Sequence, residues 1–283
     1  MKRFAPPERV TIADVAHKAA VSKTTVSHVL SGKRAVAGAT RERVQSAIRE
    51  LGYRPDGLAR SLRTQQTHMI ALMIPDIANP YYPPLARGLE DGVGAGYRTF
   101  ICNTDGETSR ERGFLEEVTD RRADGIVLDS YGISSDLVGE VVTPTTPVLR
   151  LGTTVRHDPS YDSVHADDEQ GAFEAVSYLI RGGHRRIAMI QGPPGAGGDR
   201  NDGYLRALRE VGVSLDPDLV VSGDWTRAGG AIAAQQLLSR KQPPTAIFCA
   251  NDLIALGTMD TAREAGVDIP NQLALLGFDD IEA

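Results

Sequence analysis

The sequence predicts a small all-α domain at the N-terminus, followed by an α/β body of two lobes built on doubly wound parallel sheets. At 283 residues the chain is long enough for two or three domains. Its charge is unevenly divided: residues 1–66 hold thirteen Lys/Arg and five Asp/Glu, a net charge of +8, which leaves −14 for residues 67–283. From residue 68 onward, short apolar runs alternate with helix-length amphipathic segments, as is typical of parallel βα folds.

Three short amphipathic helices fit the basic N-terminal segment. Thr11 can cap the first, with Asp14 completing a capping box. The second can begin after Ser22, and the third can begin after Thr40 and end at Gly52. Apolar residues repeat at helical spacing in all three, so the helices can share one core. These residues are Ile12, Val15, Ala16 and Ala19, then Val26, Val29 and Leu30, then Val44, Ala47, Ile48 and Leu51.

The second of these helices carries small polar and basic side chains on its outer face, including Lys23, Thr24, Ser27 and His28. Two helices joined by a tight turn, with such a face on the second, are the arrangement of a helix-turn-helix domain, in which the second helix enters the DNA major groove. A short segment with a net charge of +8 also suits a polyanion better than an ordinary solvated surface.

The same segment resembles the LacI/GalR family of transcriptional regulators. The resemblance lies in TIADVAHKAAVSKTTVSHVL and in the run TRERVQSAIRELGYRP. It implies a regulator, most simply a repressor, that binds a near-palindromic double-stranded DNA operator as a homodimer. One departure is Ala20, where the family usually has Gly in the turn. If that position needs a left-handed backbone, Ala costs about 1 kcal/mol.

The resemblance also assigns roles on the second helix. Lys can donate to guanine, Thr can reach a base edge or a thymine methyl, and His can donate or accept a hydrogen bond. The alternative for His28 is an ordinary surface histidine. The residues expected to read base edges are Lys23, Thr24 and His28, and those expected mostly to hold phosphates are Ser22, Thr25 and Ser27.

Residues 54–66 form a polar, basic connection that could be only a flexible linker. In the family this stretch is a hinge that becomes helical on DNA and inserts a leucine into the minor groove, and Leu62 matches that leucine. Asp56 replaces the usual Asn, and Gly57 weakens a helix, so we expect weak order in the absence of DNA. The expected domains are residues 1–55 (helix-turn-helix), 56–66 (hinge), 67–161 (first lobe) and 162–283 (second lobe).

The resemblance continues through the body and therefore covers nearly the whole chain. It implies a periplasmic-binding-protein-like effector sensor, with its cleft at the carboxyl ends of the strands. Carboxylates, amides, a guanidinium and aromatic faces suit a polyhydroxylated ligand, so we expect a small-molecule effector, most simply a carbohydrate. Asp252 could instead cap a helix, and the three aromatic residues could be packing residues. The residues expected near the cleft are Tyr81, Tyr82, Arg200, Trp225, Asn251, Asp252 and Asp279.

Motifs for enzyme chemistry are absent from the sequence. GPPGAGGD follows an expected strand as a phosphate loop would, but Gly198 and Asp199 replace the Lys and Ser/Thr that bind phosphate and magnesium. GVGAGY precedes a strand rather than following one, and neither G-x-S-x-G nor H-E-x-x-H occurs. We therefore predict no catalytic residue, no cofactor and no metal. A solute-binding transport protein and a sugar-metabolising enzyme are the alternatives, and both leave the basic domain without a role.

Composition and the chain ends add three expectations. No apolar run approaches the roughly 18 residues of a membrane span, and no signal-peptide pattern is present, so we expect a cytoplasmic protein. Cys102 and Cys249 lie in separate apolar segments, which favours buried thiols over a disulfide. The chain stops at Ala283, where the family continues for several tens of residues. We therefore expect a C-terminally truncated second lobe with unpaired sheet edges.

Overall fold

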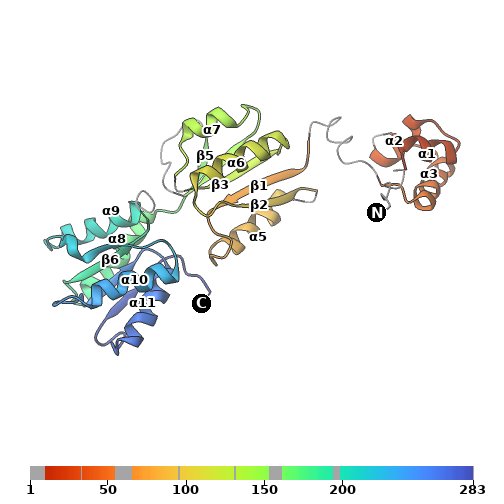
Figure 1. Ribbon diagram of the computed structural model, residues 1–283. Coiled ribbons are helices and arrows are strands. Elements are labelled where there is room, and N and C mark those ends of the chain that lie inside the picture. The colour runs from red at the N-terminus through yellow and green to blue at the C-terminus, as the bar shows by residue number, and fades with distance from the viewer. Residues whose placement is uncertain are drawn as a thin grey trace, which may run out of the picture. The chain divides into compact units, whose positions relative to one another are not determined.

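The computed structural model divides into two compact units, Met1–Thr67 and His68–Ala283 (Figure 1). The hinge leucine Leu62, and with it Asp56 and Gly57, lies outside the described residues. The structure describes residues 10–32, 34–54, 66–94, 96–130, 132–152, 161–193 and 198–282.

Three helices form the first unit: α1 (Ile12–Lys18), α2 (Lys23–Ser31) and α3 (Gly38–Leu51). They surround one small apolar core, as the sequence predicts. Val15, Val26 and Val44, one from each helix, are fully buried at its centre, and Ala16, Ala19 and Ala47 lie beside them; Ile12, Val21, Val29, Ile48, Leu51 and Tyr53 pack around the edge.

Local capping chemistry fixes most of the helix ends. The Thr11 amide donates to the Asp14 carboxylate at 2.8 Å, and the Thr25 amide donates to Ser22 Oγ at 3.1 Å, which confirms both predicted caps. Gly52 ends α3 in a left-handed conformation, with φ 61°. These ends are confirmed because each depends only on residues within one turn.

Two expectations for this unit are wrong. The third helix begins at Gly38 rather than after Thr40, because the Ala37 carbonyl already accepts the Thr40 and Arg41 amides at 2.9 and 3.0 Å. Leu30 is 38% exposed instead of lying in the core. It sits one position beyond Val29, and that step of about 100° around α2 turns its side chain away from the other helices.

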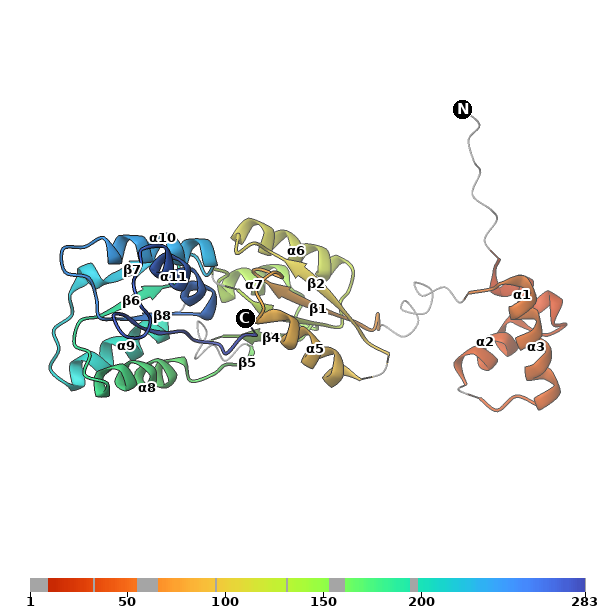
Figure 2. The same cartoon turned by 90° about the horizontal axis from the view of Figure 1, so that it is seen from below.

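The body contains two wholly parallel sheets, which confirms the predicted fold class (Figure 2). The first sheet has the strand order β2-β1-β3-β4-β5, with helices on both faces. Helix α5 packs on one face, whereas α6 and α7 pack on the other. Its elements are β1 (Met69–Ile74), α5 (Tyr82–Val93), β2 (Arg98–Asn103), α6 (Thr108–Asp120), β3 (Gly125–Asp129), α7 (Ser135–Val141), β4 (Val148–Leu151) and β5 (Asp162–Val164).

The second sheet has the strand order β7-β6-β8-β9. Helices α8 and α9 lie together on one face, and α10 and α11 lie together on the other (Figure 2). The four strands and four helices share a single large core, in which Phe248, Tyr204 and Leu237 are almost fully buried. Its elements are α8 (Asp168–Arg181), β6 (Ile187–Gln191), α9 (Gly198–Glu210), the 3₁₀ helix η2 (Pro217–Leu219), β7 (Val220–Ser222), α10 (Arg227–Leu238), β8 (Ala246–Cys249), α11 (Asp252–Glu264) and β9 (Ala274–Leu276).

Strand β5 was not expected from the sequence. Its three residues are all exposed and have no apolar run, so the pattern that identifies the other strands is absent. It pairs in parallel with β4, so the first sheet extends into residues 162–283, which the sequence assigns to the second lobe. Cys102 and Cys249 are buried and free, as expected. Among the described residues, no helix is both long and apolar enough to span a membrane.

The turn between α1 and α2 requires a left-handed residue, because Ala20 has φ 51°. Replacing Ala20 by Gly removes the Cβ strain, so we expect Ala20→Gly to stabilise the three-helix unit by roughly 0.5–1 kcal/mol. Ala47→Gly, in the interior of α3, is the matched control and should destabilise it by at least that amount. Amide hydrogen exchange of α1–α3 measures both effects. Slower exchange in the control, or faster exchange in Ala20→Gly, would contradict this account of the turn.

Candidate functional site

Helix α2 presents a polar face on the side away from the core. Ser22, Lys23 and Thr24 are exposed, whereas Thr25, Ser27 and His28 are partly exposed. Ser22 and Thr25 also fix the start of the helix, since their hydroxyls lie 2.9 Å apart in addition to the cap. Val26 is fully buried and anchors the opposite face. The structure therefore places Lys23, Thr24, Ser27 and His28 on the side of α2 away from the buried Val26, and it places Ser22 and Thr25 at the start of the helix. Leu62 lies outside the described residues.

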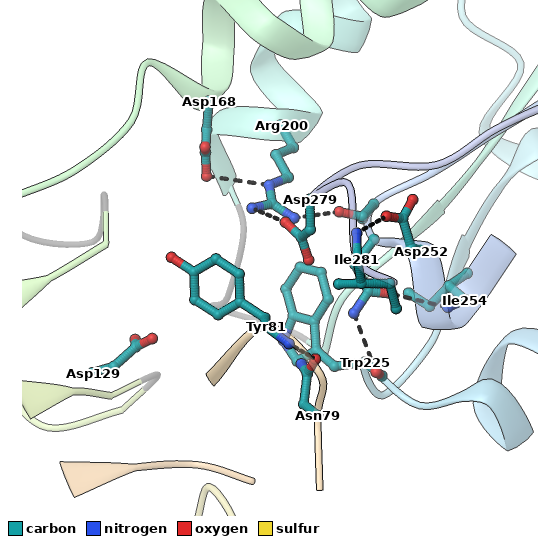
Figure 3. Close-up of polar contacts among 12 residues, drawn as sticks. Asn79, Tyr81, Asp129, Asp168, Arg200, Trp225, Asp252, Ile254, Asp279 and Ile281 are labelled. Carbon is teal, nitrogen blue, oxygen red and sulfur yellow. Dashed lines mark hydrogen bonds and ion pairs between the residues drawn. The ribbon is translucent and has the colours of Figure 1, made fainter. Parts of the chain in front are cut away.

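A second group of polar side chains gathers in the body, where strands of both sheets end (Figure 3). It includes Tyr81 after β1 and Asp129 at the end of β3, both from the first lobe. From the second lobe come Arg200 near the start of α9 and Asp279 after β9. Carboxyl ends of parallel strands share one edge of a sheet, which is why residues so distant in sequence meet.

Arg200 is the centre of this cluster. Its Nε donates to Asp168 Oδ2 at 3.1 Å, and its Nη2 forms an ion pair with Asp279 Oδ1 at 2.9 Å (Figure 3). Its Nη1 donates to the Ala250 carbonyl. The guanidinium also lies 4.1 Å from the centre of the Phe278 ring and 5.7 Å from that of Trp225. Its side chain is 14% exposed, so the position of the guanidinium is firmly set.

Two residues of the cluster adopt left-handed backbone conformations although neither is glycine: Trp225 has φ 67° and Asp279 has φ 107°. Such conformations cost of order 1–3 kcal/mol and are maintained only when neighbouring contacts hold them. Asn251 Nδ2 donates to the Trp225 carbonyl at 3.2 Å, and the Ile281 amide donates to Asp252 Oδ2 at 3.0 Å. The start of α11 therefore holds both loops.

The alternative in which Asp252 caps a helix is wrong. Asn251 is the N-cap of α11, because its Oδ1 accepts the Ile254 amide at 2.9 Å. Asn251 is 2% exposed, and both ends of its amide are used within the protein. Asn251 and Asp252 thus support the loops that carry Trp225 and Asp279.

The two predicted tyrosines differ in their environment. Tyr82 is 3% exposed and belongs to the core under α5, as the packing alternative expects, and its hydroxyl donates to Asp129 Oδ2 at 3.0 Å. Tyr81 is 41% exposed, and its ring meets that of Tyr82 edge-on at 5.2 Å. Asn79 holds the loop by accepting the Tyr81 amide at 3.1 Å.

Acidic groups of the two lobes lie close enough to affect one another. Burial raises the pKa of Asp129 to about 6, against the opposing effects of the Tyr82 hydroxyl and the Arg200 charge, and Asp168 raises it further. Burial likewise raises the pKa of Asp279 to about 6, with Arg200 opposing. The pKa of Tyr81 is raised by burial and then by Asp129 and Asp279. Tyr81 and Arg200 thus sit among carboxylates contributed by both lobes.

Sequence reasoning did not identify three members of the cluster: Asp129, Asp168 and Phe278. Asp129 and Phe278 border apolar runs, so the sequence pattern marks them only as the ends of strands and not as members of a site. Asp168 is the first residue of α8, where an acid is ordinary helix chemistry. Its one distinguishing feature, the contact with Arg200, joins residues 32 positions apart. Within the described residues, no group of three His, Cys, Asp or Glu could hold a metal ion.

The raised acid pKa values make stability depend on pH. A carboxyl group whose pKa is about 6 in the folded protein and about 4 when unfolded destabilises the fold increasingly as pH rises through that interval. Asp129→Asn removes this titrating group but keeps an acceptor for Tyr82. We expect its free energy of unfolding, relative to that of the native chain, to increase by roughly 1 kcal/mol as pH rises from 5 to 7.5.

Urea unfolding at both pH values measures this gain. Asp91→Asn is the control, since Asp91 lies on the exposed side of α5 and pairs with Arg87 of the same helix. A constant difference between Asp129→Asn and the native chain across this range would show that the Asp129 carboxyl is already charged at pH 5.

Comparison with known proteins identifies both units. Residues 11–56 match the family described as bacterial regulatory proteins, lacI family, and residues 67–283 match periplasmic binding proteins and sugar binding domain of LacI family. Catabolite control protein A of Priestia megaterium is 38% identical over 274 residues, covering 95% of this chain and 82% of that protein.

Solved structures give the same result. The lac repressor dimer bound to operator and the anti-inducer ONPF has a TM-score of 0.83 at 26% identity, covering 97% of this chain and 84% of that one. The transcriptional regulator CelR in complex with cellobiose has a TM-score of 0.65 at 30% identity, covering 96% and 84%. The chain belongs to the LacI family and is a DNA-binding transcriptional regulator with a small-molecule effector domain.

Proposed function

We propose that this protein is a repressor whose helix α2 reads a specific operator. The observation that carries the proposal is the exposed polar face of α2, anchored by the buried Val26. Lys23, Thr24 and His28 would contact base edges, and the hydroxyls of Ser22, Thr25 and Ser27 would mostly contact phosphates. Leu62 would enter the minor groove from the hinge. The similarity to a lac repressor bound to operator supports this mode of binding.

The effector would bind between the two lobes and thereby control operator affinity. Tyr81 and Asp129 would contact it from the first lobe, and Arg200, Trp225 and Asp279 from the second, with Tyr82, Asn251 and Asp252 holding these residues in place. A carbohydrate suits the combination of aromatic faces and fixed polar groups, and a CelR structure with cellobiose supports that choice. Because it bridges both lobes, the ligand would favour one lobe orientation and release the operator.

We infer that the working form is a homodimer on a near-palindromic operator, acting in the cytoplasm without catalytic activity. Strand β2 supports the dimer, because it is the edge strand of the first sheet and exposes two large apolar residues. Phe100 is 52% exposed and Ile101 is 44% exposed. An exposed apolar strand edge promotes aggregation. A second copy of the chain that packs against β2 would bury this edge.

Base reading by α2 is tested by a gel-shift titration on the operator in the chain's own promoter region. We expect Lys23→Ala and His28→Ala each to weaken specific binding about tenfold or more, because each would lose a base contact. Lys241→Ala removes the same charge from an exposed position in the body and is the control. Equal affinities for the native chain and both α2 variants would exclude these two residues from base reading.

The dimer surface is tested by sedimentation equilibrium. Phe100→Asp places a charge on the β2 edge and should convert a native dimer into a monomer, with a matching loss of operator affinity. Tyr178→Asp changes an aromatic residue on α8 that is 66% exposed, and it should leave the dimer intact. If Phe100→Asp remains dimeric while Tyr178→Asp dissociates, the interface lies on the second lobe instead.

A further inference from the structure

The effector cleft holds more negative than positive charge among the described residues. Asp168 and Asp279 pair with a single guanidinium, that of Arg200, and Asp129 lies apart from this ion-pair group (Figure 3). Arg200 is already occupied within its own lobe, since it pairs with Asp168 and Asp279 and also donates to a backbone carbonyl. Its charge is therefore largely neutralised before any ligand arrives.

Asp129 differs from the other two carboxylates. It forms no ion pair with any residue that the structure describes, and its one hydrogen-bond donor there is the neutral Tyr82 hydroxyl, at 3.0 Å. The charges that reach it from farther away include Asp168 and Glu111, which oppose its ionisation, and Arg200, which favours it. Apart from the Tyr82 hydroxyl, no group in the described part of the chain donates a hydrogen bond to Asp129 or forms an ion pair with it.

The aromatic residues of the cleft also disfavour an anionic ligand. The faces of Tyr81, Trp225 and Phe278 carry negative electrostatic potential, which attracts cations and the C–H groups of a sugar ring. An anionic ligand would lose its hydration and meet Asp129 and these faces together. Like-charge contacts of this kind are among the strongest means of rejecting a wrong partner.

We propose that Asp129 is a specificity-determining residue that makes this cleft reject anionic effectors. It takes a ligand group that can donate a hydrogen bond, either a sugar hydroxyl or an ammonium group, and it excludes phosphorylated and carboxylated sugars. This inference rests on the proposed carbohydrate effector and adds its charge class.

The test is a matched ligand panel on the full chain, read by thermal shift and by calorimetric titration. Each of glucose, galactose, mannose and cellobiose is compared with its 6-phosphate, and each hexose also with its 2-amino sugar. For any skeleton that binds, we expect the neutral or amino form to bind at least tenfold more tightly than the phosphate. If the neutral sugar binds more tightly than its 2-amino form, hydroxyls contact Asp129. If the 2-amino form binds more tightly, an ammonium group contacts it.

Asp129→Asn keeps the shape and the acceptor for Tyr82 but removes the charge. We expect this variant to reduce the ratio of the affinities for the neutral sugar and for its phosphate about tenfold. We also expect it to reduce any preference for the amino sugar. Asp91→Asn should change neither ratio. The ratio of the affinities for a neutral sugar and for its phosphate can be measured on the native chain alone. The panel therefore tests the proposal even if the variant folds poorly.

The outcomes separate two failures. If sugars bind but a phosphate binds the native chain as tightly as its neutral form, the role of Asp129 is wrong while the carbohydrate effector stands. Unchanged ratios in a well-folded Asp129→Asn variant would also show that this role is wrong. If no sugar of any charge binds while operator binding is normal, the carbohydrate effector is itself wrong and this inference falls with it.

Discussion

The fixed guanidinium of Arg200 is the interaction on which the polar cluster of the body depends. It joins the start of α8 through Asp168, the end of β8 through Ala250 and the segment after β9 through Asp279. Three segments that are distant in sequence are therefore tied at one point. An ion pair that is mostly shielded from water stabilises only when its hydrogen bonds are satisfied, and all three guanidinium nitrogens have acceptors.

The start of α11 shows how one helix end can organise two loops. Asn251 caps the helix with its oxygen and holds Trp225 with its nitrogen, so the strained backbone of Trp225 is coupled to the helix itself. Asp252, one residue later, receives the Ile281 amide and so constrains the loop of Asp279. Asn251 and Asp252 therefore constrain the loops of Trp225 and Asp279 through contacts that residue type and position alone do not reveal.

The sequence was sufficient where one turn or one strand decides the outcome. The caps at Thr11 and Ser22 and the stop at Gly52 are local hydrogen-bond chemistry, and buried strands such as β1 and β8 are recognisable as apolar runs. It was insufficient where a distant contact decides. Strand β5 pairs along the edge of β4, and Asp129 lies within electrostatic reach of Arg200, which comes 71 positions later in the sequence.

The division of charge along the chain gives a reason for separating the two functions. A basic head of net charge +8 attracts DNA phosphates, whereas a body of net charge −14 is repelled by them, so the charge distribution favours non-specific contacts with the head over contacts with the body. The proposed exclusion of anionic effectors fits the same arrangement, because a body that carries excess negative charge is poorly suited to concentrate an anionic ligand. Selection for DNA affinity in the head and for a neutral or cationic ligand in the cleft can then proceed on separate surfaces of one chain.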